Sequence, residues 1–295
     1  MKKKFIDTNI QNKSKTVKEK IQFFQYKNKT LPLPTEIEIS ESGTCNRTCS
    51  FCPRSSPNFE DKKEFISNIL HEKLCLELKE LNYKGTIRYS GFVEPLLDKN
   101  IFKLLGMARN YLPNVNLEMV TNGDPLNLER LKNLFKSGLN KILISVYDGK
   151  EDAKKFEELC QKANLIKDQF IVRHRYLSED EDFGITLSNR SGLMENAEFK
   201  IKKLKEPLKK PCYIPSYTFF LDYQGDVLMC PHDWGKKIIL GNLNKENFLD
   251  IWFSEQSMKI RNMLNKSNRQ FTPCNVCDVD GTLMGKKNAS YFSIQ

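Results

Sequence analysis

The stretch "TEIEISESGTCNRTCSFC", residues 35–52, joins a strand pattern directly to three closely spaced thiols. Residues 35–40 alternate polar and apolar side chains, which is the period of a β-strand. The loop that follows carries Cys45, Cys49 and Cys52. Because a closed structural metal site usually has four protein ligands, this loop predicts a metal site with one coordination position left open.

Strand-like and helix-like patterns alternate after this loop. Strand patterns lie at residues 85–92, 115–123, 141–149 and 169–177, and helix patterns at residues 64–81, 100–112, 127–138 and 151–164. Alternation over about 140 residues predicts a parallel sheet with right-handed crossovers. Since the strands number five or six rather than eight, we expect an α/β fold of the partial (β/α)6 TIM-barrel type.

Chemically active residues follow the predicted strands, where parallel folds of this kind place their sites. The cysteine loop follows the first strand, and the later strands end in "SGFVEP" (90–95), "TNG" (121–123), "SVYDG" (145–149) and "RHRYL" (173–177). The carboxyl ends of parallel strands share one edge of a sheet. We therefore expect thiolates, a carboxylate, small turn residues and two arginines to meet there.

The C-terminal part of the chain has a different pattern. Residues 211–234 have the pattern of a β-hairpin with the turn "YQGD", residues 247–264 that of an amphipathic helix, and "PCNVC" follows at 273–277. We expect a basic, flexible or loosely docked N-terminal extension at residues 1–34, the barrel at 35–205, a small second domain at 206–285 and a tail at 286–295.

The chain has 295 residues and nine cysteines. Its start, "MKKKFIDTNIQNKSKTVKEK", is basic but leads into no apolar segment, so we expect no secretory signal. No apolar run approaches the roughly 18 residues of a membrane-spanning helix. We expect a cytoplasmic protein, where disulfides are rare and cysteine clusters indicate metal sites. Cys75 and Cys160 stand apart in helix patterns, and we expect them to be buried free thiols.

The net charge of +10 raises the question of nucleic-acid binding. The lysines are scattered and alternate with Glu and Asp, and no aromatic signature of RNA recognition accompanies them. We therefore expect a solvated basic surface, which helps to attract an anionic substrate or partner. Neither a nucleic acid nor a membrane is an expected partner.

The pattern Cys45-x3-Cys49-x2-Cys52, with Phe51 before the last thiol, resembles the signature of the radical SAM superfamily. The resemblance implies that three thiolates hold a 4Fe–4S cluster and leave one iron free to chelate S-adenosyl-L-methionine. An electron from the cluster then breaks a carbon–sulfur bond and releases a deoxyadenosyl radical. A zinc knuckle that borrows a distant ligand remains the alternative, although zinc ribbons more often use two Cys-x2-Cys pairs.

The resemblance also implies a binding site for S-adenosyl-L-methionine. "SGFVEPLL" resembles the glycine–glycine–glutamate–proline motif, in which Glu94 would bind the amino group, although Val93 stands where glycine is usual. The residues implied to contact the ribose or the carboxylate are Thr121, Asn122, Ser145, Arg173 and Arg175. Taken singly, each of these also fits an ordinary turn or an outward charge.

Four further cysteines, Cys212, Cys230, Cys274 and Cys277, are similar in arrangement to the twitch form of the SPASM extension. This resemblance implies one auxiliary 4Fe–4S cluster whose irons are all ligated by protein. Such a cluster cannot bind substrate, so its expected role is electron transfer. A zinc ion held by the same four thiolates remains open.

The layout resembles that of deoxy-scyllo-inosamine dehydrogenase-type enzymes. It implies an oxidoreductase that abstracts hydrogen from a sugar or aminocyclitol-like molecule, passes an electron to the auxiliary cluster and uses a donor such as flavodoxin or ferredoxin. "LSNRSGL" is similar to an Asn-Arg-Ala-Gly element, so Arg190 would reach the substrate. His232 and Asp233 are candidate proton acceptors, and Tyr147 and Arg54 are further candidates near the cavity.

Two other functions remain open at this point. A peptide-modifying radical SAM enzyme, an epimerase or crosslinking maturase, often carries a leader-recognition domain, for which the 34 residues before the barrel are too few. A zinc-stabilised binding protein without catalysis would use the same cysteines.

Overall fold

The structure, a computed structural model, describes residues 13, 17, 20–57, 59–181 and 184–292. Six parallel strands form its centre: β10 (Thr218–Asp222), β3 (Glu36–Ser40), β6 (Thr86–Tyr89), β7 (Asn116–Thr121), β8 (Lys141–Val146) and β9 (Phe170–His174), in this spatial order. β11 (Asp226–Leu228) and β12 (Ile239–Asn242) extend the sheet with antiparallel pairing. The sheet is open at β12 and β9, which confirms the predicted α/β fold with a partial barrel.

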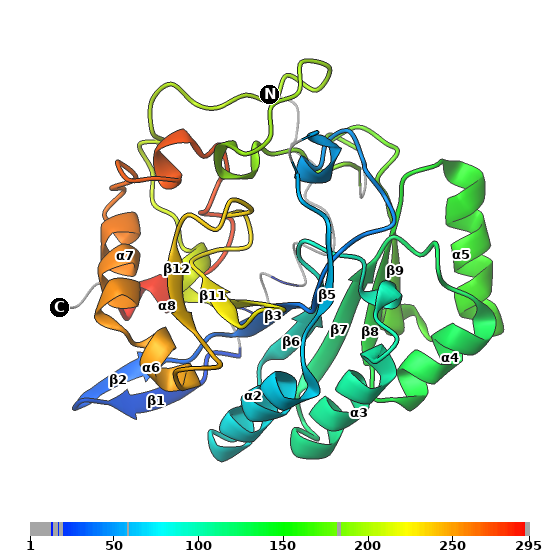
Figure 1. The fold of residues 1–295 in the computed structure, drawn as a ribbon, viewed down its shortest axis with the longest axis horizontal. Helices are drawn as coiled ribbons and strands as arrows, with labels where there is room; N and C mark the ends of the chain where they lie inside the picture. Colours follow the sequence, from blue (N-terminus) through cyan, green and yellow to red (C-terminus); the bar gives the residue numbers. More distant parts are fainter. Residues whose placement is uncertain (1–12, 14–16, 18–19, 58, 182–183, 293–295) are drawn as a thin grey trace.

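Four helices cover the outer face of the parallel strands (Figure 1). They are α2 (Asn68–Glu80), α3 (Ile101–Tyr111), α4 (Leu128–Lys136) and α5 (Lys150–Lys162), and each lies within a predicted helix pattern or one residue outside it. Ser67 accepts a hydrogen bond from the Leu70 N–H and so begins α2. Gly138, with φ +110°, allows the chain to turn after α4.

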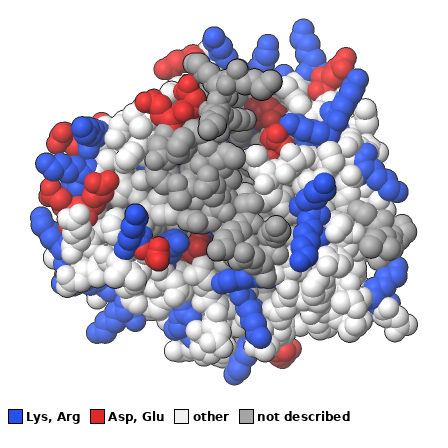
Figure 2. Space-filling view, turned by 180° about the vertical axis from the view of Figure 1, so that it is seen from behind, with Lys and Arg blue, Asp and Glu red and all other residues white. Residues whose placement is uncertain are grey.

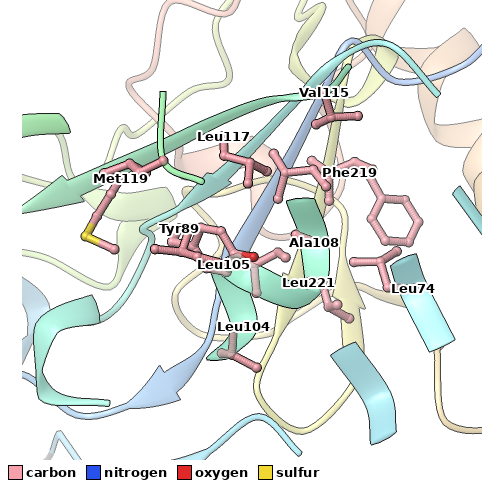
Figure 3. Packing of buried hydrophobic residues seen from close by; sticks show 14 of the residues in the cluster. Leu74, Tyr89, Leu104, Leu105, Ala108, Val115, Leu117, Met119, Phe219 and Leu221 are labelled. Carbon is pink, nitrogen blue, oxygen red and sulfur yellow. The ribbon is translucent and has the colours of Figure 1, made fainter. Parts of the chain in front are cut away.

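The main core lies between this sheet and its helices. Alternation along β3 turns Ile37 and Ile39, both fully buried, toward the helices. Figure 3 shows the same cluster from close by, with Leu74, Leu104, Leu105, Ala108, Leu117, Met119, Phe219 and Leu221 among its members. Each large apolar side chain buried in this way stabilises the fold by about 1.5–3 kcal/mol.

The predicted C-terminal hairpin is present, but its first strand belongs to the barrel sheet. β10 pairs in parallel with β3, with Thr218 opposite Glu36 and Phe220 opposite Glu38. The expectation of a separate hairpin region was therefore wrong in this respect, because one continuous sheet joins the two parts of the chain. As a result, Cys230, two residues after β11, is attached directly to the barrel sheet.

The single amphipathic helix predicted at residues 247–264 is instead two helices, α6 (Phe248–Trp252) and α7 (Glu255–Asn265). Ser254 has an extended ψ of 153° and accepts a hydrogen bond from the Ser257 N–H. This serine begins α7 as an N-cap, and its extended backbone ends α6 just before it.

The N-terminal extension differs from its prediction where the structure describes it. β1 (Phe23–Tyr26) and β2 (Lys29–Pro32) form a hairpin, and Tyr26 stacks on Phe253 with ring centroids 4.6 Å apart. Residues 20–34 are thus packed rather than loosely docked. Most of the basic start, residues 1–12, 14–16 and 18–19, lies outside the described residues. The boundaries of the four predicted segments remain predictions.

A short two-stranded sheet and a short C-terminal helix complete the fold, and the charge is spread over its surface. β4 (Ser42–Gly43) pairs with β5 (Lys62–Phe65) beside the cysteine loop, and α8 (Lys286–Ser290) lies near the C-terminus. On the face in Figure 2, Lys and Arg are scattered among Asp and Glu rather than gathered in one patch. Among the described residues, every helix is too short or too polar to cross a bilayer.

Candidate active site

A cavity of about 440 Å³ opens at the carboxyl ends of the parallel strands and reaches into the barrel. The predicted site residues that line it are Cys45, Cys49, Cys52, Glu94, Thr121, Asn122, Ser145, Arg173, Arg175, Arg190 and His232. Tyr147 and Arg54 line it as well. Asp233 and the four C-terminal cysteines do not belong to its lining.

The three thiols of the cysteine loop lie together at this cavity. Burial raises the pKa of Cys49 to about 11, and Cys52 and Cys45 raise it as well. The pKa values of Cys45 and Cys52 are also raised, chiefly by burial. Thiols with such pKa values are protonated at neutral pH, and a cationic metal group converts them to thiolates with release of protons. The three soft donors thus fit an iron–sulfur cluster.

Arg47 fixes the cysteine loop to two neighbouring strands, which the sequence did not predict. Its Nε donates to Asp124 Oδ2 (2.7 Å) after β7, and its Nη1 donates to Asp148 Oδ1 (2.9 Å) after β8. Asn46 Nδ2 donates to Asp124 Oδ2 as well (2.6 Å). Bidentate arginine–carboxylate pairs are geometrically specific, so the loop between Cys45 and Cys49 is held in one position.

Arg54 ties the other end of the loop to the segment that precedes Glu94. Its Nε donates to the Phe92 carbonyl (3.0 Å) and its Nη2 to the Gly43 carbonyl (2.9 Å), and it forms an ion pair with Asp61. The buried guanidinium therefore acts as a structural link between the cysteine loop and "SGFVEP".

Glu94 is brought together with Thr121 and Asn122, as predicted, but both of them donate hydrogen bonds to its carboxylate. Glu94 Oε1 accepts from Thr121 Oγ1 (2.6 Å) and from the Leu96 N–H (3.0 Å), and Oε2 accepts from the Asn122 N–H (2.7 Å). Burial raises the pKa of Glu94, and these hydrogen bonds oppose the rise. The carboxylate is thus oriented at the cavity wall, and Oε2 keeps a lone pair for a further donor.

Ser145, Arg173 and Arg175 lie on the opposite strands of the cavity. Arg173 Nη2 donates to Ser145 Oγ, and Arg175 Nη1 donates to Thr186 Oγ1 (3.0 Å). Tyr147 packs on Phe51 of the cysteine loop, with ring centroids 5.4 Å apart. This wall presents two guanidinium groups, which suit a carboxylate.

Arg190 lies in a strained turn between the two groups of thiols. Arg190, Ser191 and Gly192 have φ values of +46°, +54° and +84° in succession. Asn189 holds this turn through donation from Nδ2 to the Val276 carbonyl (2.7 Å). Non-glycine residues in this left-handed region are strained, and such strain clusters at functional sites.

The Arg190 side chain extends from this turn to the cavity. Its guanidinium lies 5.9 Å from the Trp234 ring centroid, and its Nε has no hydrogen-bond partner among the described residues. Arg190 partly offsets the burial-driven rise in the pKa of Cys52 and also lowers the pKa of His232. The guanidinium is therefore electrostatically close to the first thiol group and to the segment that carries Cys230.

The four C-terminal thiols form a second, enclosed group. Cys230, Cys274 and Cys277 are each at most 8% exposed. Cys212, Cys274 and Cys277 each raise the pKa of Cys230, and burial raises the pKa of Cys212 to about 11. Among the described residues, no three His, Cys, Asp or Glu side chains are arranged to bind one metal ion. Four soft donors, three of them buried and Cys212 half-buried, fit a fully ligated iron–sulfur cluster.

Arg269 fixes the segments around this second group, and no sequence pattern had pointed to it. Its Nε, Nη1 and Nη2 donate to the carbonyls of Lys210 (3.0 Å), Val279 (3.0 Å) and Pro211 (2.7 Å). Its charge also opposes the rise in the pKa of Cys212. Gly281 packs directly on the Cys212 sulfur, where a side chain would collide with it.

His232 and Asp233, the two candidate proton acceptors, have different surroundings. Burial lowers the pKa of His232 to about 3, with Arg190 and Lys13 acting in the same direction. Asp233 Oδ1 and Oδ2 accept from the N–H groups of Lys237 (3.0 Å) and Ile238 (2.8 Å). Both oxygens of Asp233 stabilise a turn away from the cavity lining, so of the two residues His232 is the one placed to contact a bound molecule.

The two cysteines outside these groups have the predicted environment. Cys75 is 1% exposed and Cys160 is fully buried, and both are free thiols in helices α2 and α5. They pack in the main core as small apolar side chains.

Comparisons with known proteins agree with this geometry. Residues 39–172 match the radical SAM superfamily, and residues 212–278 match the SPASM iron–sulfur cluster-binding domain. The chain is 30% identical over 234 residues to the S-adenosyl-L-methionine-dependent 2-deoxy-scyllo-inosamine dehydrogenase of Niallia circulans, covering 79% of this chain and 88% of the relative. It is 32% identical over 134 residues to GTP 3',8-cyclase of Campylobacter lari, covering 45% and 39% of the two chains.

Solved structures show the same likeness. The crystal structure of BtrN in complex with AdoMet and 2-DOIA has 28% identity and a TM-score of 0.70, covering 84% of this chain and 94% of BtrN. The structure of anSMEcpe with bound AdoMet has 14% identity and a TM-score of 0.52, covering 88% and 92%, and shows the fold alone. The chain is therefore an enzyme of the radical SAM superfamily with a C-terminal SPASM domain, and its cofactors are S-adenosyl-L-methionine and 4Fe–4S clusters.

Proposed function

We propose that this enzyme oxidises a hydroxylated small molecule, a sugar or an aminocyclitol. The observation that carries the proposal is that one cavity is lined by Cys45, Cys49 and Cys52 and also by Arg190, whose neighbour Ser191 is hydrogen-bonded to Cys277 of the enclosed thiols. When bound, the cluster at the cysteine loop and S-adenosyl-L-methionine supply the radical that takes a hydrogen atom from a carbinol carbon. The name of the Niallia circulans relative supports this substrate class.

The chain's own residues would bind and orient the cofactors. Cys45, Cys49 and Cys52 would hold the SAM-binding cluster, and Cys212, Cys230, Cys274 and Cys277 the auxiliary one. The remaining lone pair of Glu94 Oε2 suits an amino group, and the guanidinium groups of Arg173 and Arg175 suit a carboxylate.

Arg190 would contact the substrate oxygen. A guanidinium stays protonated in proteins, so Arg190 can donate hydrogen bonds and stabilise negative charge on oxygen but cannot accept a proton. Its position between the two thiol groups fits a substrate located between the two cofactor sites. His232 lines the same cavity and stays a candidate for the proton acceptor.

An external electron donor such as flavodoxin or ferredoxin is part of the proposal, because each cleavage of S-adenosyl-L-methionine consumes an electron. A cytoplasmic location is also part of it, since all nine cysteines are free thiols in the structure and thiols stay reduced there. No nucleic acid is expected to bind, because the lysines are scattered among Glu and Asp along the sequence, and on the face drawn in Figure 2 the basic side chains are dispersed.

The proposal is tested by turnover under anaerobic conditions. The chain reconstituted with iron and sulfide is mixed with dithionite, S-adenosyl-L-methionine and 2-deoxy-scyllo-inosamine, the molecule named in the Niallia circulans relative. We expect 5′-deoxyadenosine and the corresponding ketone in equal amounts by mass spectrometry. Deoxyadenosine without an oxidised product, from this compound and from a panel of sugars and cyclitols, would contradict the proposal.

A further inference from the structure

A layer of charged side chains lies on the inner face of the barrel, deeper than the cysteine edge. Because side chains alternate along β3, Glu36 and Glu38 face the interior while Ile37 and Ile39 face the helices. Glu36 is 2% exposed, whereas Glu38 is only partly buried and lines the cavity. Substrate inside the barrel therefore has access to Glu38.

The positively charged residues of this layer, Lys13 and Arg88, form ion pairs with carboxylates other than Glu38. Arg88 lies directly opposite Glu38 in the pairing of β3 with β6. Its guanidinium nevertheless binds Glu36 Oε1 (2.6 Å) and Glu118 Oε2 (2.6 Å). Lys13 Nζ binds the same Glu36 oxygen (2.8 Å). Both positive charges are thus committed to Glu36 and Glu118.

Glu38 is left without a cation of its own. Ser90 Oγ donates to Glu38 Oε1 (2.6 Å), and among the described residues Glu38 forms no ion pair and its Oε2 accepts no hydrogen bond. Arg88 pairs with both Glu36 and Glu118, Lys13 pairs with Glu36, and Lys141, opposite Glu118 in the pairing of β7 with β8, also lowers the pKa of Glu118. Among the described residues, Glu38 is therefore the one of these three carboxylates without an ion pair, and it faces the cavity.

A buried carboxylate without an ion pair is costly unless a ligand neutralises it. Burial raises the pKa of Glu38 and Glu36 raises it further, while Lys13 and Arg88 act in the opposite direction. Lys13 and Arg88 also line the cavity, as do the guanidinium groups of Arg173, Arg175 and Arg190. Glu38 is thus a carboxylate of the cavity lining that has no ion-pair partner among the described residues.

We propose that Glu38, with Ser90, binds a protonated amine of the substrate, so that the substrate class is an aminated polyol rather than a neutral one. This inference rests on the proposed function. The ammonium donates to the free Glu38 oxygen and to the Ser90 hydroxyl, which already donates to Glu38 and can still accept. A hydroxyl at the same place would leave the carboxylate charge uncompensated.

The test is calorimetric titration of the reconstituted enzyme, saturated with S-adenosyl-L-methionine. The probes are 2-deoxy-scyllo-inosamine and its neutral analogue with a hydroxyl in place of the amine. We expect the wild type to bind the amine at least about tenfold more tightly. Glu38→Gln keeps the shape but removes the charge, and should weaken amine binding by roughly tenfold to a hundredfold, the range for a hydrogen bond to a charged group. Its affinity for the neutral analogue should not fall.

Glu118→Gln is the matched control, because it removes the same charge from a carboxylate of this layer that does not line the cavity. It should weaken amine binding much less than Glu38→Gln does. Ser90→Ala serves as the second variant and should weaken amine binding by a smaller factor. Equal affinity of wild type and Glu38→Gln for the amine, or equal loss in Glu118→Gln, would overturn the inference.

A separate measurement distinguishes this inference from the proposed function. The proposed function requires only that wild-type enzyme with dithionite cleaves S-adenosyl-L-methionine and oxidises some hydroxylated substrate, charged or neutral, whereas the inference requires an amine. If it oxidises neutral polyols and binds no amine, only the role of Glu38 fails. If no polyol is oxidised, the proposed function fails.

Discussion

The two groups of thiols use the same donor atoms but differ in access. Cys45, Cys49 and Cys52 are half-buried and line the cavity. Cys230, Cys274 and Cys277 are at most 8% exposed, and none of the second group lines it. An open site can bind a further ligand, whereas a closed one cannot, as catalytic and structural zinc sites also show. The first group, called the open site here, therefore suits cofactor chemistry. The second group, Cys212, Cys230, Cys274 and Cys277, called the enclosed site, suits electron transfer.

The two groups are also anchored differently. The first is held by Arg47 through carboxylates at the ends of two strands, at the surface. The second is held by Arg269, 2% exposed, through three backbone carbonyls. Surface ion pairs contribute little to stability, whereas a buried carbonyl that loses its donor is costly. The enclosed site should therefore be coupled more strongly to folding than the open one.

Loss of the open site should have the largest effect on activity. Cys49→Ala removes one of three thiolates, so the cysteine loop can no longer hold its cluster. We expect no reductive cleavage of S-adenosyl-L-methionine and about half of the wild-type iron. Iron analysis and chromatography of deoxyadenosine check this. Deoxyadenosine release at the wild-type rate would show that the open site is not the one that cleaves S-adenosyl-L-methionine.

Loss of the enclosed site should separate cleavage from oxidation. Cys274→Ala should also lose about half of the iron but keep cleavage of S-adenosyl-L-methionine, because the cysteine loop is intact. Oxidation of the substrate should be lost, since the electron acceptor is missing. Assaying deoxyadenosine and ketone in the same mixture gives both values. Full substrate conversion by this variant would exclude electron transfer as the role of the enclosed site.

Arg269→Met should lower the stability of the fold and release iron from the enclosed site. Its three carbonyl partners lose their donor, for which we expect a decrease in the free energy of unfolding of about 2–4 kcal/mol. Arg109→Met is the matched control, since Arg109 also donates to carbonyls, those of Pro113, Val115 and Gly138, but away from both thiol groups. Urea unfolding and iron analysis should show that only Arg269→Met loses iron from the enclosed site.

Arg47→Met should have the smallest effect on stability, about 1 kcal/mol or less, because its ion pairs are partly exposed. It should nevertheless speed the loss of iron from the open site to a chelator, since the loop between Cys45 and Cys49 is no longer fixed. Arg47→Lys keeps the charge without the bidentate geometry, so its rate of iron loss should lie between those of the wild type and Arg47→Met. The loss is followed as the decrease in cluster absorbance after a chelator is added. Identical rates of loss in wild type, Arg47→Met and Arg47→Lys would show that the ion pairs of Arg47 do not protect this site.

The sequence predicts local patterns well and long-range partners poorly. The alternation in residues 35–40 and the thiol spacing predicted β3 and the cysteine loop correctly. The bonds of Arg47 span 77 and 101 residues, so no local pattern contains them. The parallel pairing of β10 with β3 was missed for the same reason.

The proposed role of Glu38 in binding is a second feature that the sequence did not predict. A polar residue at every second position of a strand indicates a face turned to water. In a partial barrel, the same face lines a cavity, and its charges are partnered or used for binding. The pairing of Glu36 with Lys13 and Arg88, and the absence of such a pair at Glu38 among the described residues, is visible only in three dimensions.

The most direct measurement is Mössbauer spectroscopy of the two single-site variants with and without S-adenosyl-L-methionine. Cys274→Ala contains only the open site, and we expect the signal of one iron to shift when the cofactor is added. Cys49→Ala contains only the enclosed site, and its spectrum should not change. A cofactor-dependent shift in Cys49→Ala, or none in Cys274→Ala, would contradict the assignment of open and closed coordination to the two thiol groups.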